Sequence, residues 1–130
     1  MNVQVFPLAK HEDERGWFAE LARGSRLPKA IRQANLAWSR KGVIRGLHFH
    51  ERGQDDLFVC LQGMVRVVVL DRETGETFCR DIGERNPEAV TNTTTTSCSV
   101  AGIAASSISF IISRLPANLK SCSKSLAMSR

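Results

Sequence analysis

The amino-acid sequence predicts an all-β domain, a β-sandwich or barrel, on three observations. Short apolar runs recur about every ten residues between residues 1 and 90. Turn-forming glycines such as Gly63 and Gly75 separate several of these runs. No part of this segment keeps the 3.6-residue period of an amphipathic helix. Short strands with Gly-rich turns at regular spacing are typical of sandwiches and barrels.

Eight strands are expected in this segment. Between the sixth and the seventh, the sequence from Asp71 to Glu76 reads as a turn, in which Gly75 is free to take a positive φ. The predicted strands cover residues 3–6, 17–21, 31–38, 43–49, 57–61, 65–70, 77–82 and 88–90.

The composition changes at residue 91. Residues 91–130 are rich in Ser and Thr and contain no Asp, Glu, His, Trp or Tyr. Strand signals are faint there, although residues 108–112 have high β-propensity. The sequence therefore predicts a partial domain over residues 1–90 and a low-complexity tail over residues 91–130.

The positive charge of the chain is concentrated in this tail. The net charge is +5, and four of the 18 Lys and Arg but none of the 13 Asp and Glu follow residue 90. The rest of the chain is nearly balanced, so we expect neither a nucleic-acid partner nor a membrane partner. The run 108–112 is too short to span a bilayer.

The four cysteines include no CxxC pair, and Cys60 lies in the apolar run LFVCL, where a buried thiol is expected. The first residues show no charged region followed by an apolar stretch, as a secretory signal would. We therefore expect a soluble, cytoplasmic protein.

Two of the three histidines, His48 and His50, alternate with Leu47 and Phe49. A period of two is that of a strand, so both imidazoles should leave the same face. Strict alternation would put Arg45 on the opposite face. A bulge at Gly46 is therefore required if Arg45 and His48 are to share one cavity.

Three segments carry a family resemblance: DERGWFAE (13–20), QANLAWSRKGVIRGLHFH (33–50) and LFVCLQGMVRVVVLDRETGETF (57–78). They resemble the dTDP-4-dehydrorhamnose 3,5-epimerase family of the cupin superfamily, over about residues 1–90. The resemblance implies a cupin-type jelly roll, incomplete in this chain, that forms a homodimer. It also implies a nucleotide-linked 4-keto-6-deoxyhexose as substrate, in deoxysugar and dTDP-rhamnose biosynthesis, with no metal and no cofactor.

The same resemblance implies roles for individual residues. His48 would be the general base that removes protons next to the sugar ketone, a role for which a side chain with an ordinary pKa of about 6.5 is suited. Arg45 would contact the substrate. The remaining implied substrate-binding residues are Gln33 and Asn35 along the diphosphate, and Arg15, Phe18 and Glu20 around the nucleotide, partly across the dimer.

Several departures from the family pattern predict impaired catalysis, and they leave open whether the chain is an active isomerase. The family's general acid is a tyrosine, and this chain has none. Neither the second active-site histidine nor the aspartate that orients the base is present after residue 90. Asp55 and Asp56 stand where a lysine is usual. A reading-frame shift in the coding DNA would explain why the match ends near residue 90.

Two alternatives remain open. The first is a metal-binding cupin, because Gly42, His48 and His50 have the spacing of a metal cupin, and Asp55 or Asp56 would supply a carboxylate. The second is a non-catalytic β-sandwich that binds a sugar nucleotide.

Overall fold

The computed structural model describes residues 2–23, 33–49, 54–94, 98–102, 107–114 and 124–125. Within them the chain forms twelve strands, ten of which make two facing sheets. The first six strands are β1 (Val3–Pro7), β2 (Lys10–Asp13), β3 (Gly16–Ala19), β4 (Gln33–Ser39), β5 (Arg45–Phe49) and β6 (Gln54–Gln62). The other six are β7 (Met64–Leu70), β8 (Thr77–Gly83), β9 (Glu88–Thr94), β10 (Cys98–Gly102), β11 (Ser107–Arg114) and β12 (Lys124–Ser125).

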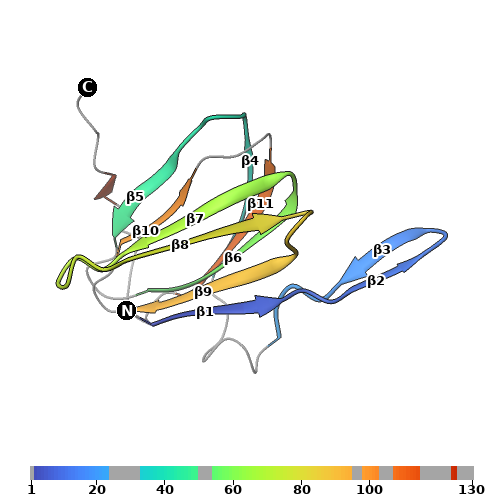
Figure 1. Cartoon of the computed structure of the whole chain (residues 1–130), viewed down its shortest axis with the longest axis horizontal. Helices are drawn as coiled ribbons and strands as arrows, with labels where there is room; N and C mark the ends of the chain where they lie inside the picture. Colours follow the sequence, from blue (N-terminus) through green and yellow to red (C-terminus); the bar gives the residue numbers. More distant parts are fainter. Residues whose placement is uncertain are drawn as a thin grey trace.

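Ten of these strands make two antiparallel sheets. One sheet has the order β1-β9-β6-β11-β4 and the other has the order β12-β5-β10-β7-β8. Strands β4 to β11 cross between the sheets as the eight strands of a jelly roll do, with β7 and β8 consecutive in one sheet, and β1 and β12 are added at the edges. The remaining pair, β2 and β3, forms a hairpin that extends away from both sheets (Figure 1).

Strand β7 illustrates why the chain forms a sandwich. Val65, Val67 and Val69 are buried, whereas Arg66 between them is exposed. Period-two alternation of this kind gives a strand one buried and one solvated face. The buried valines pack against Phe58 of β6 and against further apolar side chains of β6, β8 and β9, so they define the inner face of their sheet.

Strand β6 is buried on both of its faces. Phe58 points into the core between the sheets, whereas Leu57 and Val59 belong to a second, smaller cluster on the outer face. Leu8 and Leu21, from the segments that flank the hairpin, cover this second cluster. The continuous apolar run of β6 is therefore explained by its position in the middle of a sheet that is covered on both sides.

The predicted all-β fold is confirmed, and each of the eight predicted strands coincides with an observed one. The burial predicted for Cys60 is also confirmed, and this burial raises the pKa of its thiol. Strand β2 was not predicted, because its residues are all exposed and polar. Among the residues that the structure describes, no helix is long and apolar enough to cross a membrane.

Strands β10, β11 and β12 follow residue 90, where no strand was predicted. Strand β11 contains the apolar run 108–112 and lies between β6 and β4, and β10 lies between β5 and β7. Strand β9 continues across residue 90 to Thr94. The division at residue 90 stays a prediction from composition, and strands from both sides of it pair in each sheet.

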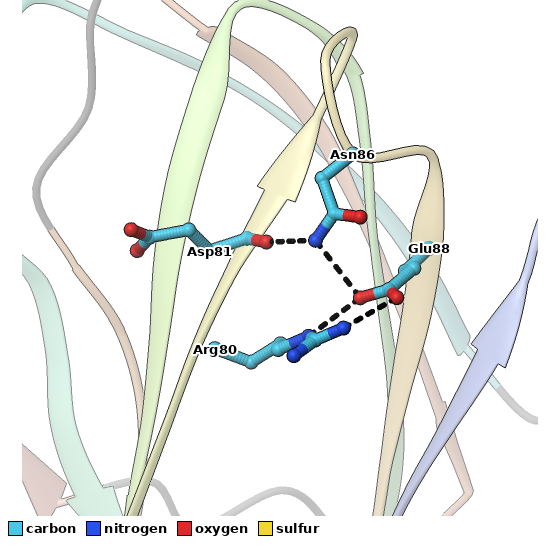
Figure 2. A network of polar contacts seen from close by, with 4 residues as sticks. All are labelled: Arg80, Asp81, Asn86 and Glu88. Carbon is cyan, nitrogen blue, oxygen red and sulfur yellow. Dashed lines mark hydrogen bonds and ion pairs between the residues drawn. The ribbon is translucent and has the colours of Figure 1, made fainter.

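A polar network links the two sheets at the open edge beside β8. Figure 2 shows the guanidinium of Arg80 on β8 donating two hydrogen bonds, of 2.6 and 2.5 Å, to the carboxylate of Glu88 on β9. Asn86 donates to the same carboxylate and to the backbone carbonyl of Asp81. Bidentate pairing of this kind fixes geometry as well as charge, so the network ties β8 to β9.

The turns at Gly63 and Gly83 pack against each other so closely that they predict a large mutational effect. A Cβ atom on Gly83 would lie 2.1 Å from the backbone oxygen of Gly63, and the φ of Gly83 is +153°. We expect Gly83→Ala to lower the free energy of unfolding by roughly 3 kcal/mol or more, through steric overlap added to backbone strain. Urea denaturation measures this loss.

The matched control for that prediction is Gly75→Ala. Gly75 also has a positive φ, +74°, but a Cβ atom there would meet nothing within 4 Å. Its cost should be only the conformational one, about 1–2 kcal/mol. Equal losses in the two variants would contradict the close approach of the two turns.

The ion pair between Arg80 and Glu88 predicts a pH dependence of stability. Hydrogen bonds from Arg80 hold the pKa of the Glu88 carboxyl below its ordinary value of 4.5. A carboxyl whose pKa is lower in the folded state stabilises the protein above its unfolded pKa, and this contribution is lost as the pH falls through the folded value. From pH 4.5 downwards, Glu88→Gln should therefore lose less stability than the wild type.

Urea denaturation at several pH values between about 6 and 3 measures this difference. The control variant is Glu73→Gln, in the exposed turn between β7 and β8. Parallel pH profiles for Glu88→Gln and the wild type would show that the ion pair does not stabilise the fold.

Candidate functional site

Strands β5 and β10 pair in an irregular register that bears directly on the candidate site. His48 lies opposite Ser99, and Arg45 lies opposite Ala101. Three steps along β5 thus correspond to two steps along β10, so β5 contains one extra residue between Arg45 and His48. Sequence analysis made a bulge at Gly46 the condition for Arg45 and His48 to share one cavity, and the register shift shows an irregularity in that interval.

The extra residue brings the positions of Arg45 and His48 onto one face. Their partner positions on β10 lie opposite Val67 and Val69 of β7, whose buried side chains belong to the core between the sheets. Directly opposed residues of neighbouring strands share a face. The register therefore puts both positions in the inward-facing rows of this sheet.

Arg45 is also held by the other sheet. Its Nε donates a hydrogen bond of 2.8 Å to the Oγ of Ser39, and its Nη2 donates one of 2.9 Å to the backbone carbonyl of Trp38. Ser39 ends β4 in one sheet and Arg45 begins β5 in the other. The guanidinium therefore spans the corner where the chain crosses between the sheets.

Two more predicted site residues lie on the inner face of β4. Ile111 of β11 lies opposite Asn35 on one side and opposite Phe58 of β6 on the other, and Phe58 is part of the core. The position of Asn35 therefore faces the same side as Phe58. Gln33 is two residues earlier and shares this face. The Nε2 of Gln33 donates a hydrogen bond of 3.0 Å to the Oδ1 of Asn35, and both side chains are exposed. They line the same strand face as Ser39, the partner of Arg45.

The interior becomes polar at the end of this row. Asp56 of β6 lies opposite Asn92 of β9, and each is only 2% exposed. Ser113 of β11 lies between Asp56 and Gln33 and opposite both, so Asn92, Asp56, Ser113 and Gln33 form one row across the sheet. The Oδ1 of Asn92 has no hydrogen-bond partner within the described part of the chain. A buried acceptor of this kind is costly unless a donor reaches it.

The three residues predicted to hold the nucleotide lie elsewhere. Arg15 is in the turn of the β2–β3 hairpin, where it forms an exposed ion pair with Asp13. Phe18 on β3 is 69% exposed. Glu20 follows the hairpin, and its carboxylate accepts hydrogen bonds from Arg23. Because the hairpin extends away from the sheets (Figure 1), the fold of one chain does not bring these residues to Arg45.

The metal-binding alternative depends largely on residues that the structure does not describe. His50 lies outside the described residues, and His48 is described only by its place in β5. Among the described side chains there is no group of three or more His, Cys, Asp or Glu that could hold a metal ion. Asp55 and Asp56 begin β6, and Asp56 is buried.

Sequence reasoning missed two residues of this interior, Ser39 and Asn92. Ser39 could have been found by alternation, because it lies four residues after Asn35 and so shares its strand face. Asn92 follows the composition change at residue 91, and no strand was predicted there. Together with Gln33, Asn35 and Asp56, they make the described part of this inner face polar, with one cationic donor, Arg45.

Comparison with known proteins identifies the family of this chain. The chain matches the family model of dTDP-4-dehydrorhamnose 3,5-epimerase over residues 1–85. It is 42% identical over 92 residues to the spore coat polysaccharide biosynthesis protein SpsL of Bacillus subtilis. That match covers 66% of this chain and 60% of the relative, so the chain spans less than two thirds of the relative's length.

Solved structures show the same fold. The dTDP-4-dehydrorhamnose 3,5-epimerase of Sulfolobus tokodaii superposes with a TM-score of 0.79 at 20% identity, over 90% of this chain and 72% of that one. The dTDP-6-deoxy-D-glucose-3,5-epimerase of Legionella pneumophila, solved with dTDP-4-keto-L-rhamnose, gives 0.74 at 22% identity, over 85% and 65%. Both likenesses establish the cupin-type jelly roll. With the family match over residues 1–85, they lead to one conclusion: this chain belongs to the dTDP-4-dehydrorhamnose 3,5-epimerase family.

Proposed function

We propose that this chain binds a nucleotide-linked 4-keto-6-deoxyhexose between its two sheets and keeps a weakened form of 3,5-epimerase chemistry. The observation that carries the proposal is the extra residue in β5, which supports Arg45 and His48 on one inner face. The Legionella relative was solved with a dTDP-linked keto sugar, which supports this substrate class.

In the proposed reaction His48 is the base. A proton on the carbon next to the sugar ketone is acidic enough for an imidazole to remove, because the resulting negative charge moves onto the ketone oxygen. A nearby cation stabilises that enolate. Arg45 supplies the positive charge, and its contacts with Ser39 and Trp38 hold it at the corner of the two sheets.

Epimerisation also requires that a proton return from the opposite face of the sugar. The family resemblance implies a tyrosine for this step, and the chain contains none. A missing general acid typically costs about 10²- to 10⁴-fold in rate. We therefore expect that this chain still removes the proton next to the ketone, but that it completes the inversion of the carbon far more slowly.

The proposed proton removal can be measured as exchange of hydrogen with the solvent. Incubation with a dTDP-4-keto-6-deoxyhexose in D₂O should give slow incorporation of deuterium next to the ketone, with little epimerised product, as followed by mass spectrometry. His48→Ala should abolish the exchange. Arg45→Lys should slow it by about tenfold or more, because lysine keeps the charge but not the guanidinium geometry.

The appropriate control is Glu73→Ala, which changes an exposed side chain of the turn between β7 and β8. Exchange that persists in His48→Ala would show that another group is the base. Stabilisation by the nucleotide sugar in a thermal-shift titration, without any exchange, would favour the non-catalytic sugar-binding alternative. Epimerisation at an ordinary enzymatic rate would refute the proposed impairment.

We further propose that the chain forms a homodimer. The hairpin carries the exposed aromatic side chains Trp17 and Phe18, and the outer face of edge strand β4 exposes Leu36 and Trp38. An unpaired sheet edge with exposed apolar side chains usually requires a cover. A second copy would supply one, and it would allow the hairpin residues to reach a partner's interior.

Light scattering at micromolar concentration should therefore give twice the chain mass of 14.4 kDa. Leu36→Asp, on the exposed face of β4, should shift the protein towards the monomer because it puts a charge into the proposed contact. Thr77→Asp, exposed at the start of β8, is the control. A monomeric wild type that still binds a dTDP-sugar would contradict the proposed dimer.

The proposed compartment is the cytoplasm. Cys60 and Cys79 are both free thiols, and Cys79 is exposed. Exposed free cysteines are more common where the surroundings are reducing.

A further inference from the structure

We propose that Ser39 is a positioning residue that orients the guanidinium of Arg45 towards a ligand between the sheets. The inference deepens the proposed function, because it takes Arg45 to be the group that meets the anionic oxygens of a nucleotide sugar. It rests on the geometry of the corner between β4 and β5, which gives Ser39 a specific partner.

Ser39 is one of the few buried polar residues that the structure describes, with 7% of its surface exposed. It ends β4 on the inner face, and its Oγ accepts a 2.8 Å hydrogen bond from the Nε of Arg45. A serine hydroxyl both donates and accepts. Here it serves as an acceptor for a charged donor, which is a stronger interaction than one between neutral groups.

The two observed contacts determine which part of Arg45 is left for a ligand. A guanidinium carries five N–H groups in a rigid plane. The Nε–H points to Ser39, and one Nη2–H points to the carbonyl of Trp38. Among the described residues no further contact is made by both hydrogens of Nη1 and one of Nη2, which lie along the end of the fork. That edge matches two oxygens of a phosphate or carboxylate.

The contact with Trp38 alone would not fix this orientation. A single hydrogen bond from Nη2 leaves the guanidinium plane free to rotate about it, whereas a second bond from Nε defines the plane. Loss of the Ser39 hydroxyl should therefore loosen Arg45 while its charge and its contact with Trp38 remain. The expected effect is on ligand affinity through Arg45 and not on the fold.

A double-mutant cycle tests this dependence. The affinity for dTDP-glucose is measured by calorimetry for the wild type, Ser39→Ala, Arg45→Ala and the double variant. Ser39→Ala should weaken binding by about tenfold in the wild type, and by less than about twofold once Arg45 is absent. Ser39→Thr keeps the hydroxyl and should restore most of the affinity.

The matched control is Thr91→Ala, which removes another buried hydroxyl, one whose Oγ1 lies 3.5 Å from the carbonyl of Gln4. It should leave the affinity for dTDP-glucose unchanged. An equal loss of affinity from Ser39→Ala with and without Arg45, or an equal loss from Thr91→Ala, would overturn the proposal and leave Ser39 a merely structural residue.

A second measurement requires no ligand, so it separates this inference from the proposed function. The Nε–H of Arg45 gives its own NMR signal, and its hydrogen bond to Ser39 should slow exchange with solvent. Exchange should be about tenfold faster in Ser39→Ala than in the wild type or in Ser39→Thr. Unchanged exchange would overturn the inference. If exchange changes as expected but dTDP-glucose does not bind the wild type, the proposed function fails and the positioning of Arg45 stands.

Discussion

Apolar packing between the inner faces of β6, β7 and β9 joins the two sheets of the sandwich. Phe58, Val67 and Val90 meet in one cluster, with exposed fractions of 3% or less. Because side chains alternate along a strand and opposed residues share a face, this cluster decides which residues of β4 and β5 face the interior. The position of the candidate site is therefore a consequence of the hydrophobic core.

The corner between β4 and β5 holds the candidate site residues that this packing positions. The chain leaves one sheet at Ser39 and enters the other at Arg45, and the guanidinium closes the crossing with two hydrogen bonds. One extra residue in β5 then puts the position of His48 in register with the same face as that of Arg45. A bulge disrupts the local ladder, so its presence between two chemically distinctive residues is consistent with a functional role.

The interior differs in its charge balance from what the family resemblance implies. Asp55 and Asp56 stand where the family resemblance implies a lysine, and Asp56 is buried opposite Asn92. The described inner-face residues around the candidate site are thus rich in acceptors, and Arg45 is the one cation among them. An anionic ligand would depend heavily on that one arginine, which is why its orientation by Ser39 matters.

Several features could be read from the sequence because they depend only on local patterns. The apolar run over residues 65–70 predicted a strand, and counting residues between Arg45 and His48 showed that they could share a cavity only with an irregularity near Gly46. The family resemblance implied that His48 is the general base. Strands β10 and β11 were missed, because Ser- and Thr-rich segments carry little hydrophobic pattern and are ordered here only by pairing with neighbours distant in sequence.

The sequence by itself thus determined the all-β class, most strand positions and the chemical identity of the candidate residues. Only the tertiary structure decided that Ser39 meets Arg45, that Asn92 is buried beside Asp56, and that Arg15 and Phe18 extend away from the interior. The physical reason is that period-two alternation specifies the face of a strand but not its neighbours. Those neighbours are set by long-range pairing and by the packing of one sheet on the other.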